Sequence, residues 1–373
     1  MMIPPLPADS IVERRFVIEG VAGSGGMGTV YRAKDLRLNR LVALKFIRGN
    51  DLELRRRFEQ EARAQARILH PGICQVYEVG ELGEQLYIAM QLIDGLPLDR
   101  ATAAMSMTEK VQVIRDVARA LHAAHELGII HRDIKPSNIM VEQKVKELGS
   151  PSYWPIIMDF GLAREGGAGK GMTESGAVLG TPSYMSPEQA RGDIRKLDRR
   201  TDVYSLGATL YDLIVGVPPF DDATVYNILL RVMSEEPKPP RRHNPTIPES
   251  LDTIITKCLS KEPEQRYSTS LALAEDLDRF LGAQKIIGRR AGLWYRARYY
   301  ARQNKPLTAL GAALLICVLG LVGYGVSNRL ELLRRERSAR RQAELSTQLG
   351  QAIKDMEWLL RSARQMPLHD LER

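Results

Sequence analysis

The sequence contains little cysteine and no recognisable leader segment. Three cysteines, Cys74, Cys258 and Cys317, are spread over 373 residues without metal-ligand spacing. This pattern argues against a disulfide framework and a cysteine-based zinc site, and it favours a reduced, cytosolic main domain. The first ten residues, MMIPPLPADS, contain neither a basic segment nor an apolar core, so we expect no signal peptide and a cytosolic N-terminus.

Charged side chains are missing from residues 307–326, LTALGAALLICVLGLVGYGV. A helix of this length spans the ~30 Å hydrocarbon layer of a bilayer. Core helices rarely run so far without a charge, so the stretch predicts one transmembrane helix rather than a buried core helix. Trp294, Tyr295, Tyr299 and Tyr300 precede it among basic residues, as is typical of a membrane interface.

Positive charge is concentrated in the C-terminal part. Residues 282–373 hold 17 Lys and Arg against 7 Asp and Glu, whereas residues 1–281 hold 36 against 38. A nucleic-acid-binding domain would place its basic patch on the fold itself, so we expect no nucleic-acid partner. The basic linker 282–306 contains seven Lys and Arg and no acid. Its positive charge favours binding to anionic membrane lipids; alternatively, the linker serves only to fix the topology of the membrane span.

A glycine-rich loop lies near the start of the chain. Residues 16–22 predict a strand that leads into Gly23-Ser24-Gly25-Gly26-Met27-Gly28, and residues 29–33 continue as a second strand. Glycine lets the backbone approach phosphates closely. A dinucleotide-binding fingerprint requires a helix at this place, so the strand–loop–strand pattern argues against it.

One lysine, Lys45, interrupts the apolar strand predicted over residues 41–47. Alone it would be an edge-strand lysine that reaches solvent. The helix predicted over residues 55–69 changes this, because Glu61 lies beside its apolar face and could orient the ammonium group against nucleotide phosphates. Glu59 is the alternative partner. The apolar face is predicted from Phe58, Ala62 and Leu69.

Residues 85–95 predict a buried strand that runs into a short connection. A purine could hydrogen-bond to the exposed backbone edge of such a connection. Met90 would border the adenine pocket, and the Gln91 carbonyl and the Ile93 amide would be the hydrogen-bonding groups.

The densest group of reactive side chains follows Ile130. In His131-Arg132-Asp133-Ile134-Lys135-Pro136-Ser137-Asn138, Asp133 can accept the proton of an incoming hydroxyl and Lys135 can neutralise a transferring phosphoryl group. Asn138 and Asp159, the latter in Asp159-Phe160-Gly161, offer the hard oxygen ligands that suit Mg²⁺, with Mn²⁺ as a substitute. His131 is interpreted as a structural histidine rather than a base.

Two segments beside these groups carry further predictions. Residues 141–154 predict an extended surface loop in which Tyr153 and Trp154 either dock a partner or cap the edge of the domain. The glycine-rich stretch 166–176 is typical of a mobile loop. Within it Thr173 and Ser175 are candidate phosphorylation sites, and Arg132 is the group that would receive the phosphate.

These motifs, in this order, resemble those of the bacterial Hanks-type (eukaryotic-like) serine/threonine protein kinases across residues 14–281. The resemblance implies an α+β, bilobal protein-kinase fold, with a small β-rich N-lobe over about residues 14–93 and a large, mainly helical C-lobe over about 94–281. Residues 1–13 would be an N-terminal extension. The residues expected around ATP are Val21, Gly23, Gly25, Gly26, Gly28, Val30, Ala43, Lys45, Met90, Gln91 and Ile93.

The resemblance also implies roles for residues outside the reactive groups. Gly180-Thr181-Pro182 and Ser186-Pro187-Glu188 are similar to the family's substrate-facing loop, and Lys135 and Thr181 favour serine and threonine over tyrosine. Arg266 is the implied partner of Glu188, and Asp202 lies in the implied central helix. Ser186, where alanine is commoner, Gln91, where an acid often stands, and the long spacing from Asn138 to Asp159 depart from the family's pattern.

Three functions remain to be compared. A kinase would transfer phosphate from ATP to protein hydroxyls, whereas a membrane-tethered pseudokinase scaffold would have lost at least one of Lys45, Asp133, Asn138 and Asp159. All four are present, so we expect catalysis. A small-molecule phosphotransferase is less consistent with the peptide-holding loops.

The positive-inside rule does not decide the orientation of the predicted transmembrane helix, since residues 287–306 and 327–346 each hold six Lys and Arg. A domain that uses ATP works in the cytosol, so we expect a single-pass cell membrane protein with a cytoplasmic kinase and an extracytoplasmic C-terminal segment. Residues 327–373 predict an amphipathic helix, either a coiled coil that makes a homodimer for trans-phosphorylation or a helix that packs on a larger sensor domain. We expect the chain to be part of a longer receptor. The apolar stripe consists of Leu345, Leu349, Ile353, Met356, Leu360 and Ala363.

Overall fold

The computed structural model describes residues 6–25, 28–47, 59–60, 62–83, 85–145, 151–160, 182–288 and 305–364. By its contacts the chain divides into two compact units, Met1–Gly292 and Leu293–Arg373. The first unit holds every predicted catalytic residue.

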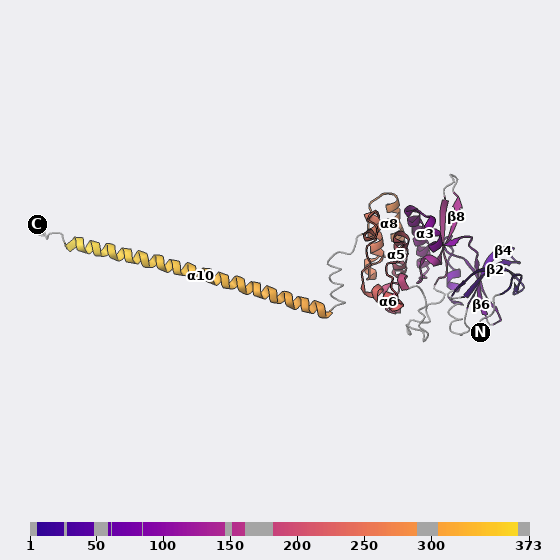
Figure 1. Ribbon diagram of the computed structural model, residues 1–373, viewed down its shortest axis with the longest axis horizontal. Coiled ribbons are helices and arrows are strands. Elements are labelled where there is room, and N and C mark those ends of the chain that lie inside the picture. Colours follow the sequence, from indigo (N-terminus) through magenta and orange to yellow (C-terminus); the bar gives the residue numbers. More distant parts are fainter. Residues whose placement is uncertain are drawn as a thin grey trace. The chain divides into compact units, whose positions relative to one another are not determined.

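A six-stranded antiparallel sheet opens the first unit, in the order β1-β2-β3-β4-β6-β5 (Figure 1). Side chains alternate between its faces, so Val42, Leu44 and Phe46 of one strand join one apolar cluster while Ala43 joins another. Lys45 shares the face of Ala43. The strands are β1 (Ile11–Val12), β2 (Phe16–Gly25), β3 (Gly28–Asp35), β4 (Arg40–Ile47), β5 (Val76–Leu82) and β6 (Gln85–Gln91).

The helix predicted over residues 55–69 is described in part: residues 59–60 and 62–66 are helical. Ala62 is buried, as its predicted apolar face requires, but Leu69 is 84% exposed, so its assignment to that face is wrong. The reason is that helical structure stops before Leu69, and Ile68 is the side chain that enters the core instead. Phe58 and Glu61 lie outside the described residues.

A second sheet joins β7 (Leu96–Pro97), β8 (Ile139–Val145) and β9 (Pro151–Ile157). The prediction of an extended loop over 141–154 is therefore wrong for residues 141–145 and 151–154, which pair as an antiparallel hairpin. β-Branched and aromatic residues favour such strands. Tyr153 packs against the large core, while Trp154 is 51% exposed with Lys144 Nζ 4.9 Å from its ring centroid.

The rest of the first unit is mainly helical and surrounds one large apolar core. The long central helix α5 begins with the Asp198 side chain accepting a hydrogen bond from the Arg200 amide and ends at Gly216, whose φ of 89° suits glycine. The α-helices are α2 (Leu98–Ala101), α3 (Met107–Glu126), α4 (Pro187–Ala190), α5 (Arg199–Val215), α6 (Val225–Ser234), α7 (Glu249–Cys258) and α8 (Ser270–Leu281). The 3₁₀ turns are η1 (Thr102–Ala104), η2 (Pro136–Asn138), η3 (Pro182–Tyr184), η4 (Ile194–Lys196), η5 (Pro240–Arg242) and η6 (Pro263–Gln265).

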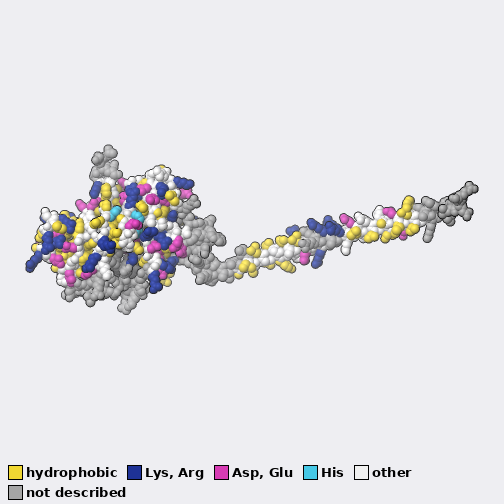
Figure 2. Space-filling view, turned by 180° about the vertical axis from the view of Figure 1, so that it is seen from behind, with side chains coloured by type: hydrophobic (Ala, Val, Ile, Leu, Met, Phe, Trp, Pro, Cys, Tyr) yellow, Lys and Arg dark blue, Asp and Glu magenta, His cyan; other side chains and the backbone are white. Residues whose placement is uncertain are grey.

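The second unit contains one described helix, α10 (Lys305–Arg364). Figure 2 shows Lys and Arg side chains gathered along it between two stretches richer in apolar side chains. Three residues of the predicted stripe, Leu345, Leu349 and Met356, are exposed on this helix, with accessibilities of 59%, 62% and 59%. Within the described parts of the chain, no helix combines the length and the apolarity that crossing a membrane requires, so the predicted span 307–326 is not confirmed.

Candidate active site

The loop that follows α3 is held by a buried carboxylate. Asp202 of α5 is fully buried and accepts hydrogen bonds from the backbone amides of His131 and Arg132, each at 2.8 Å, and from His125 Nε2 at 2.7 Å. Burial acts to raise the pKa of Asp202, but the hydrogen bonds from His125 and His131 outweigh it and the net pKa is lowered. Arg132 has a φ of +64°, an unfavourable backbone conformation that these bonds offset.

His131 is held as a neutral, structural side chain. It is fully buried, and burial lowers its pKa. Its Nδ1 accepts the Asp133 amide at 3.2 Å, so its Nε2 carries the proton and donates to the Met158 carbonyl at 2.7 Å. Its ring centroid lies 4.6 Å from that of Phe160. Both ring nitrogens are thus used inside the fold, which agrees with the structural interpretation.

Three side chains of the same loop converge. Lys135 Nζ lies 3.1 Å from Asp133 Oδ2, and Asn138 Nδ2 donates to the same oxygen at 3.0 Å and to the Asp133 carbonyl at 2.8 Å. The short turn η2, begun by Pro136, places Asn138 for these bonds. Since its amide nitrogen faces Asp133, the amide oxygen of Asn138 faces away from it.

Lys45 pairs with Asp159 across the site. Its Nζ is 2.5 Å from Asp159 Oδ1, and Lys45 is 6% exposed. Asp159 Oδ1 is buried and has no donor at hydrogen-bond geometry among the described residues, so the contact is an ion pair. The predicted pairing with Glu61 stays a prediction, because Glu61 lies outside the described residues. Glu59, the alternative, has its carboxylate 3.6 Å from Arg63 at the surface.

Asp159 and Asn138 are the residues that would hold a divalent cation. The Met158 amide donates to the Asn138 carbonyl at 2.9 Å. Because Asp159 directly follows Met158, this bond brings Asp159 close to Asn138. The Asp159 carboxylate, which pairs with Lys45 in this structure, and the amide oxygen of Asn138 are hard oxygen ligands of the kind that Mg²⁺ prefers. No group of three or more His, Cys, Asp or Glu that could hold a metal ion is found among the described residues.

Most residues predicted around the adenine lie together. Ala43 and Met90 pair across β4 and β6 and belong to one apolar cluster, against which Val30 and Ile93 pack. The Gln91 carbonyl accepts a weak hydrogen bond from Cys74 Sγ at 3.7 Å. These residues line one face of the first sheet, on the side of Lys45.

The glycine-rich loop is a hairpin between β2 and β3. Gly25 pairs with Gly28, whose φ is 153°, and a Cβ added at Gly23 would meet no atom within 4 Å. Val21 is 54% exposed and does not belong to the apolar cluster of Ala43 and Met90. Gly26 lies outside the described residues, as do Gly161, Thr173, Ser175 and Thr181.

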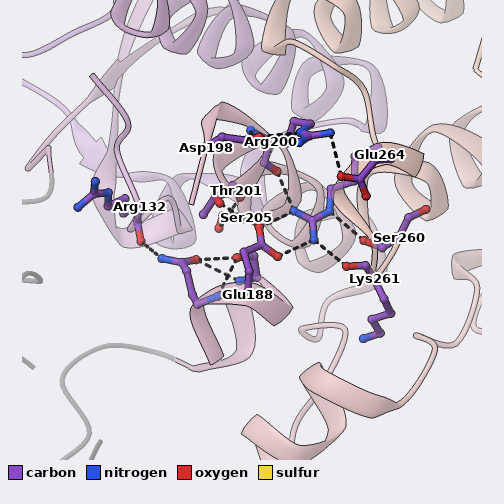
Figure 3. Close-up of polar contacts among 12 residues, drawn as sticks. Arg132, Glu188, Asp198, Arg200, Thr201, Ser205, Ser260, Lys261 and Glu264 are labelled. Carbon is purple, nitrogen blue, oxygen red and sulfur yellow. Dashed lines mark hydrogen bonds and ion pairs between the residues drawn. The ribbon is translucent and has the colours of Figure 1, made fainter. Parts of the chain in front are cut away.

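Glu188 and Arg266 form a buried ion pair, the pairing that the resemblance implies (Figure 3). Two parallel bonds join them, Nη1 to Oε1 at 2.7 Å and Nη2 to Oε2 at 2.8 Å. Thr201 of α5 also donates to Glu188 Oε1 at 2.9 Å. Burial acts to raise the pKa of Glu188, and the Arg266 guanidinium lowers it below the ordinary value.

Two residues that contact the site, His125 and Gln189, could not be predicted from the sequence. His125 lies 77 positions from Asp202, and nothing local signals that pairing. Gln189 follows Ser186 by three residues, a capping-box spacing that signals the helix start. The same spacing gives no hint that the Gln189 side chain also reaches the loop of Asp133.

Comparisons with known proteins agree with this geometry. The family model described as the protein kinase domain matches residues 16–277. The chain is 40% identical over 276 residues to the serine/threonine-protein kinase PknB of Mycobacterium tuberculosis, covering 71% of this chain and 42% of that protein. It is 37% identical over 275 residues to the serine/threonine-protein kinase pkn3 of Myxococcus xanthus, covering 70% and 49%.

A solved structure of a kinase domain has a similar fold. The crystal structure of the PknI kinase domain of Mycobacterium tuberculosis superposes with a TM-score of 0.57 at 26% identity, covering 74% of this chain and 99% of that one. The chain spans less than half the length of the curated relatives reported above. Because the family model covers well over half of the sequence, the chain belongs to the protein kinase domain family.

Proposed function

We propose that this protein is a serine/threonine protein kinase that transfers the γ-phosphate of ATP to hydroxyl groups of proteins. The observation that carries the proposal is the convergence of Lys135 and Asn138 on one oxygen of Asp133, at 3.1 and 3.0 Å. Family membership and the names of the relatives support the same reaction and the same class of acceptor.

Each residue has a part in this chemistry. Asp133, anchored through its backbone, would accept the proton of the attacking hydroxyl. Lys135 places a positive charge beside that point, where the transferring phosphoryl group accumulates negative charge. Lys45, on the adenine side, would hold the α- and β-phosphates. The fixed loop supplies orientation, which together with electrostatic stabilisation accounts for most of the catalysis of phosphoryl transfer.

We further propose Mg²⁺ as the cofactor, with Mn²⁺ as a substitute, held by Asp159 and Asn138. When bound, a divalent cation neutralises charge on the nucleotide phosphates. The fit rests on the buried Asp159 Oδ1 and its neighbour Asn138. The Lys45–Asp159 ion pair would be exchanged for contacts with the nucleotide and its cation, because both partners are then used elsewhere.

The first experiment is phosphate transfer from labelled ATP by the full chain in detergent, with Mg²⁺, beside Lys45→Met and Asp133→Asn. Label on the protein that is lost in both variants supports the proposal, and mass spectrometry then tests Thr173 and Ser175 as autophosphorylation sites with Arg132 as their binding partner. Nucleotide binding without transfer to the chain or to a generic protein would instead favour the pseudokinase scaffold.

We propose in addition that the protein is anchored in the cell membrane by residues 307–326, with a cytoplasmic kinase and an extracytoplasmic C-terminal segment. The support is the absence of charge from these twenty residues and the basic linker before them. Each Lys or Arg of the linker near anionic lipid would add about 1 kcal/mol of attraction. The described helices do not support this proposal, since none of them is long and apolar enough to cross a membrane.

Alkaline extraction of membranes from cells that express the full chain tests the anchor. We expect the chain to stay in the pellet, and Leu314→Arg with Leu321→Arg to release it, since each charge in the bilayer centre costs about 3 kcal/mol. Thr347→Arg is the matched control. Recovery of the unmodified chain in the soluble fraction would rule the anchor out.

We propose lastly that the stripe on α10 forms a homodimer. Its apolar side chains recur every three or four residues and are exposed in the single chain, with Ile353 51% and Leu360 63% accessible. Crosslinking of the full chain should yield a dimer that Leu349→Asp with Met356→Asp removes. If the stripe packs on another domain instead, the two substitutions will leave the yield of crosslinked dimer unchanged.

A further inference from the structure

The side chain of Gln189 makes contacts in two directions. At one end it closes the capping box that begins α4: the Ser186 amide donates to Gln189 Oε1 at 3.1 Å, and the Gln189 amide donates to Ser186 Oγ at 3.4 Å. At the other end Gln189 Nε2 donates to the Arg132 carbonyl at 2.7 Å. In Figure 3 the dashed line that ends at the labelled Arg132 marks this bond.

The chemistry at the two ends fixes which atom of the amide faces which partner. A backbone carbonyl can only accept, so the nitrogen of the Gln189 amide must face Arg132. A backbone amide can only donate, so the oxygen must face Ser186. Glutamine satisfies both demands at once, which glutamate and methionine do not.

The peptide group that Gln189 contacts lies directly before Asp133. Its carbonyl, from Arg132, accepts from Gln189, and its N–H, from Asp133, donates to His131 Nδ1 at 3.2 Å. Arg132 is strained at a φ of +64°, and its own amide is held by Asp202. The Gln189 bond is therefore the contact to this peptide that comes from the α4 side.

The helix α4 is itself fixed in place. Glu188, the residue before Gln189, is joined to Arg266 by two bonds and to Thr201 by a third. A bond from such a rigid point restrains the carbonyl it contacts, whereas a bond from a loose surface side chain would not.

We propose that Gln189 is a positioning residue for phosphoryl transfer: it holds the Arg132–Asp133 peptide so that the Asp133 carboxylate meets the acceptor hydroxyl. This inference rests on the proposed kinase function. It also ties the base to the segment around Glu188, so the two sides of the acceptor site keep one geometry. Misplacing a reacting group by about 1 Å can cost up to about 100-fold in rate.

Steady-state kinetics of the full chain with a serine peptide and ATP test this. Gln189→Glu keeps the acceptor for Ser186 but removes the donor to Arg132, and Gln189→Met removes both. We expect kcat to fall about tenfold or more in each variant, with the KM for ATP and the thermal midpoint within about twofold and a few degrees of the parent. Gln143→Glu, the same change at an exposed residue of β8, should leave all three values unchanged.

Ser186→Ala separates the two ends of the bridge. It removes the hydroxyl of the capping box while the Ser186 amide still donates to Gln189. The fall in the logarithm of kcat should therefore be less than about a third of the fall in Gln189→Met. The inference is overturned if kcat of both Gln189 variants stays within about twofold of the parent, or if it falls together with ATP affinity or thermal stability. Failure of the parent chain itself to transfer phosphate would instead reject the proposed function.

Discussion

Arg266 uses all its hydrogen-bonding capacity on buried partners, and Glu188 takes two of the five bonds. A guanidinium has five N–H donors. Besides the two bonds to Glu188, the donors reach the backbone carbonyls of Ser260, Arg200 and Lys261 at 2.9, 3.0 and 3.0 Å. Its side chain is fully buried. Arg266 therefore ties the Glu188 segment to the first turn of α5 and to the Ser260–Lys261 segment, and the two partners of this ion pair are not equivalent.

The first prediction follows from this inequality. Arg266→Met leaves a buried carboxylate and three carbonyls without their donor, and removal of one partner of a buried pair costs about 3–5 kcal/mol. Glu188→Gln leaves the Arg266 charge buried without its counter-ion, but it keeps an acceptor for one guanidinium N–H and the three carbonyl bonds, so its cost should lie at or below the lower end of that range, at about 2–3 kcal/mol. Urea unfolding of the full chain measures both free energies.

Arg200→Met is the control for this comparison. Arg200 pairs with Asp198 at a partly exposed site, and such pairs contribute about 1 kcal/mol or less. Equal losses in the Glu188 and Arg266 variants would contradict the prediction, since they would mean that the carbonyl bonds of Arg266 contribute nothing.

The second prediction concerns Lys261, a buried amine. It is 2% exposed, its Nζ donates to the Val232 carbonyl at 2.8 Å and lies 4.2 Å from the Phe220 ring centroid, and burial lowers its pKa to about 7. An unfolded lysine titrates near about 10.4, so between pH 7 and 10 the unfolded chain binds more protons and stability rises with pH.

The measurement is the difference between the parent chain and Lys261→Met in free energy of unfolding at pH 7 and pH 9. We expect this difference to move in favour of the parent by about 1–2 kcal/mol, less than the full shift allows because the ring of Phe220 favours the charged form. A difference that stays constant with pH would show that Lys261 titrates in the folded chain as it does in the unfolded one.

The third prediction concerns the charge beside the base. Lys135→Met removes the ammonium group 3.1 Å from Asp133 Oδ2, and loss of one group that stabilises transition-state charge costs about 10²-fold in kcat. The KM for ATP should change little, because the proposed function assigns the nucleotide phosphates to Lys45 and not to Lys135. Lys144→Met, at an exposed ion pair with Glu142, is the control. A large rise in the KM for ATP with kcat preserved would place Lys135 in nucleotide binding instead.

How much the sequence could predict depends on the range of each interaction. Asp133, Lys135 and Asn138 are five residues apart at most, so a short motif predicts their convergence. The bond from Gln189 to Arg132 spans 57 positions and requires the folded chain. Leu69 was misplaced because helical periodicity does not say where a helix stops, and the hairpin of β8 and β9 was missed because Gly149, Ser150 and Pro151 indicate a loop as readily as a turn.

The fourth prediction concerns the end of the kinase unit, where one carboxylate holds the chain. Asp276 of α8 accepts the amides of Ile287 and Gly288 at 2.9 and 2.7 Å, and the Tyr267 hydroxyl at 2.9 Å. A Cβ at Gly288 would lie 2.4 Å from the Tyr267 hydroxyl oxygen, so Gly288→Ala must displace this contact. Asp276→Ala removes the acceptor itself.

Hydrogen exchange of the full chain, followed by mass spectrometry on the peptide that covers Ile287 and Gly288, checks this attachment. Bonds to a charged acceptor contribute about 1.5–3 kcal/mol, so exchange there should become about tenfold faster or more in both variants. Glu275→Gln, on the same helix, should leave the rate unchanged. Equal exchange rates in the parent and in Asp276→Ala would contradict the prediction. An amide that already exchanges freely in the parent is not protected by Asp276, so the backbone bonds to Asp276 would not persist in solution.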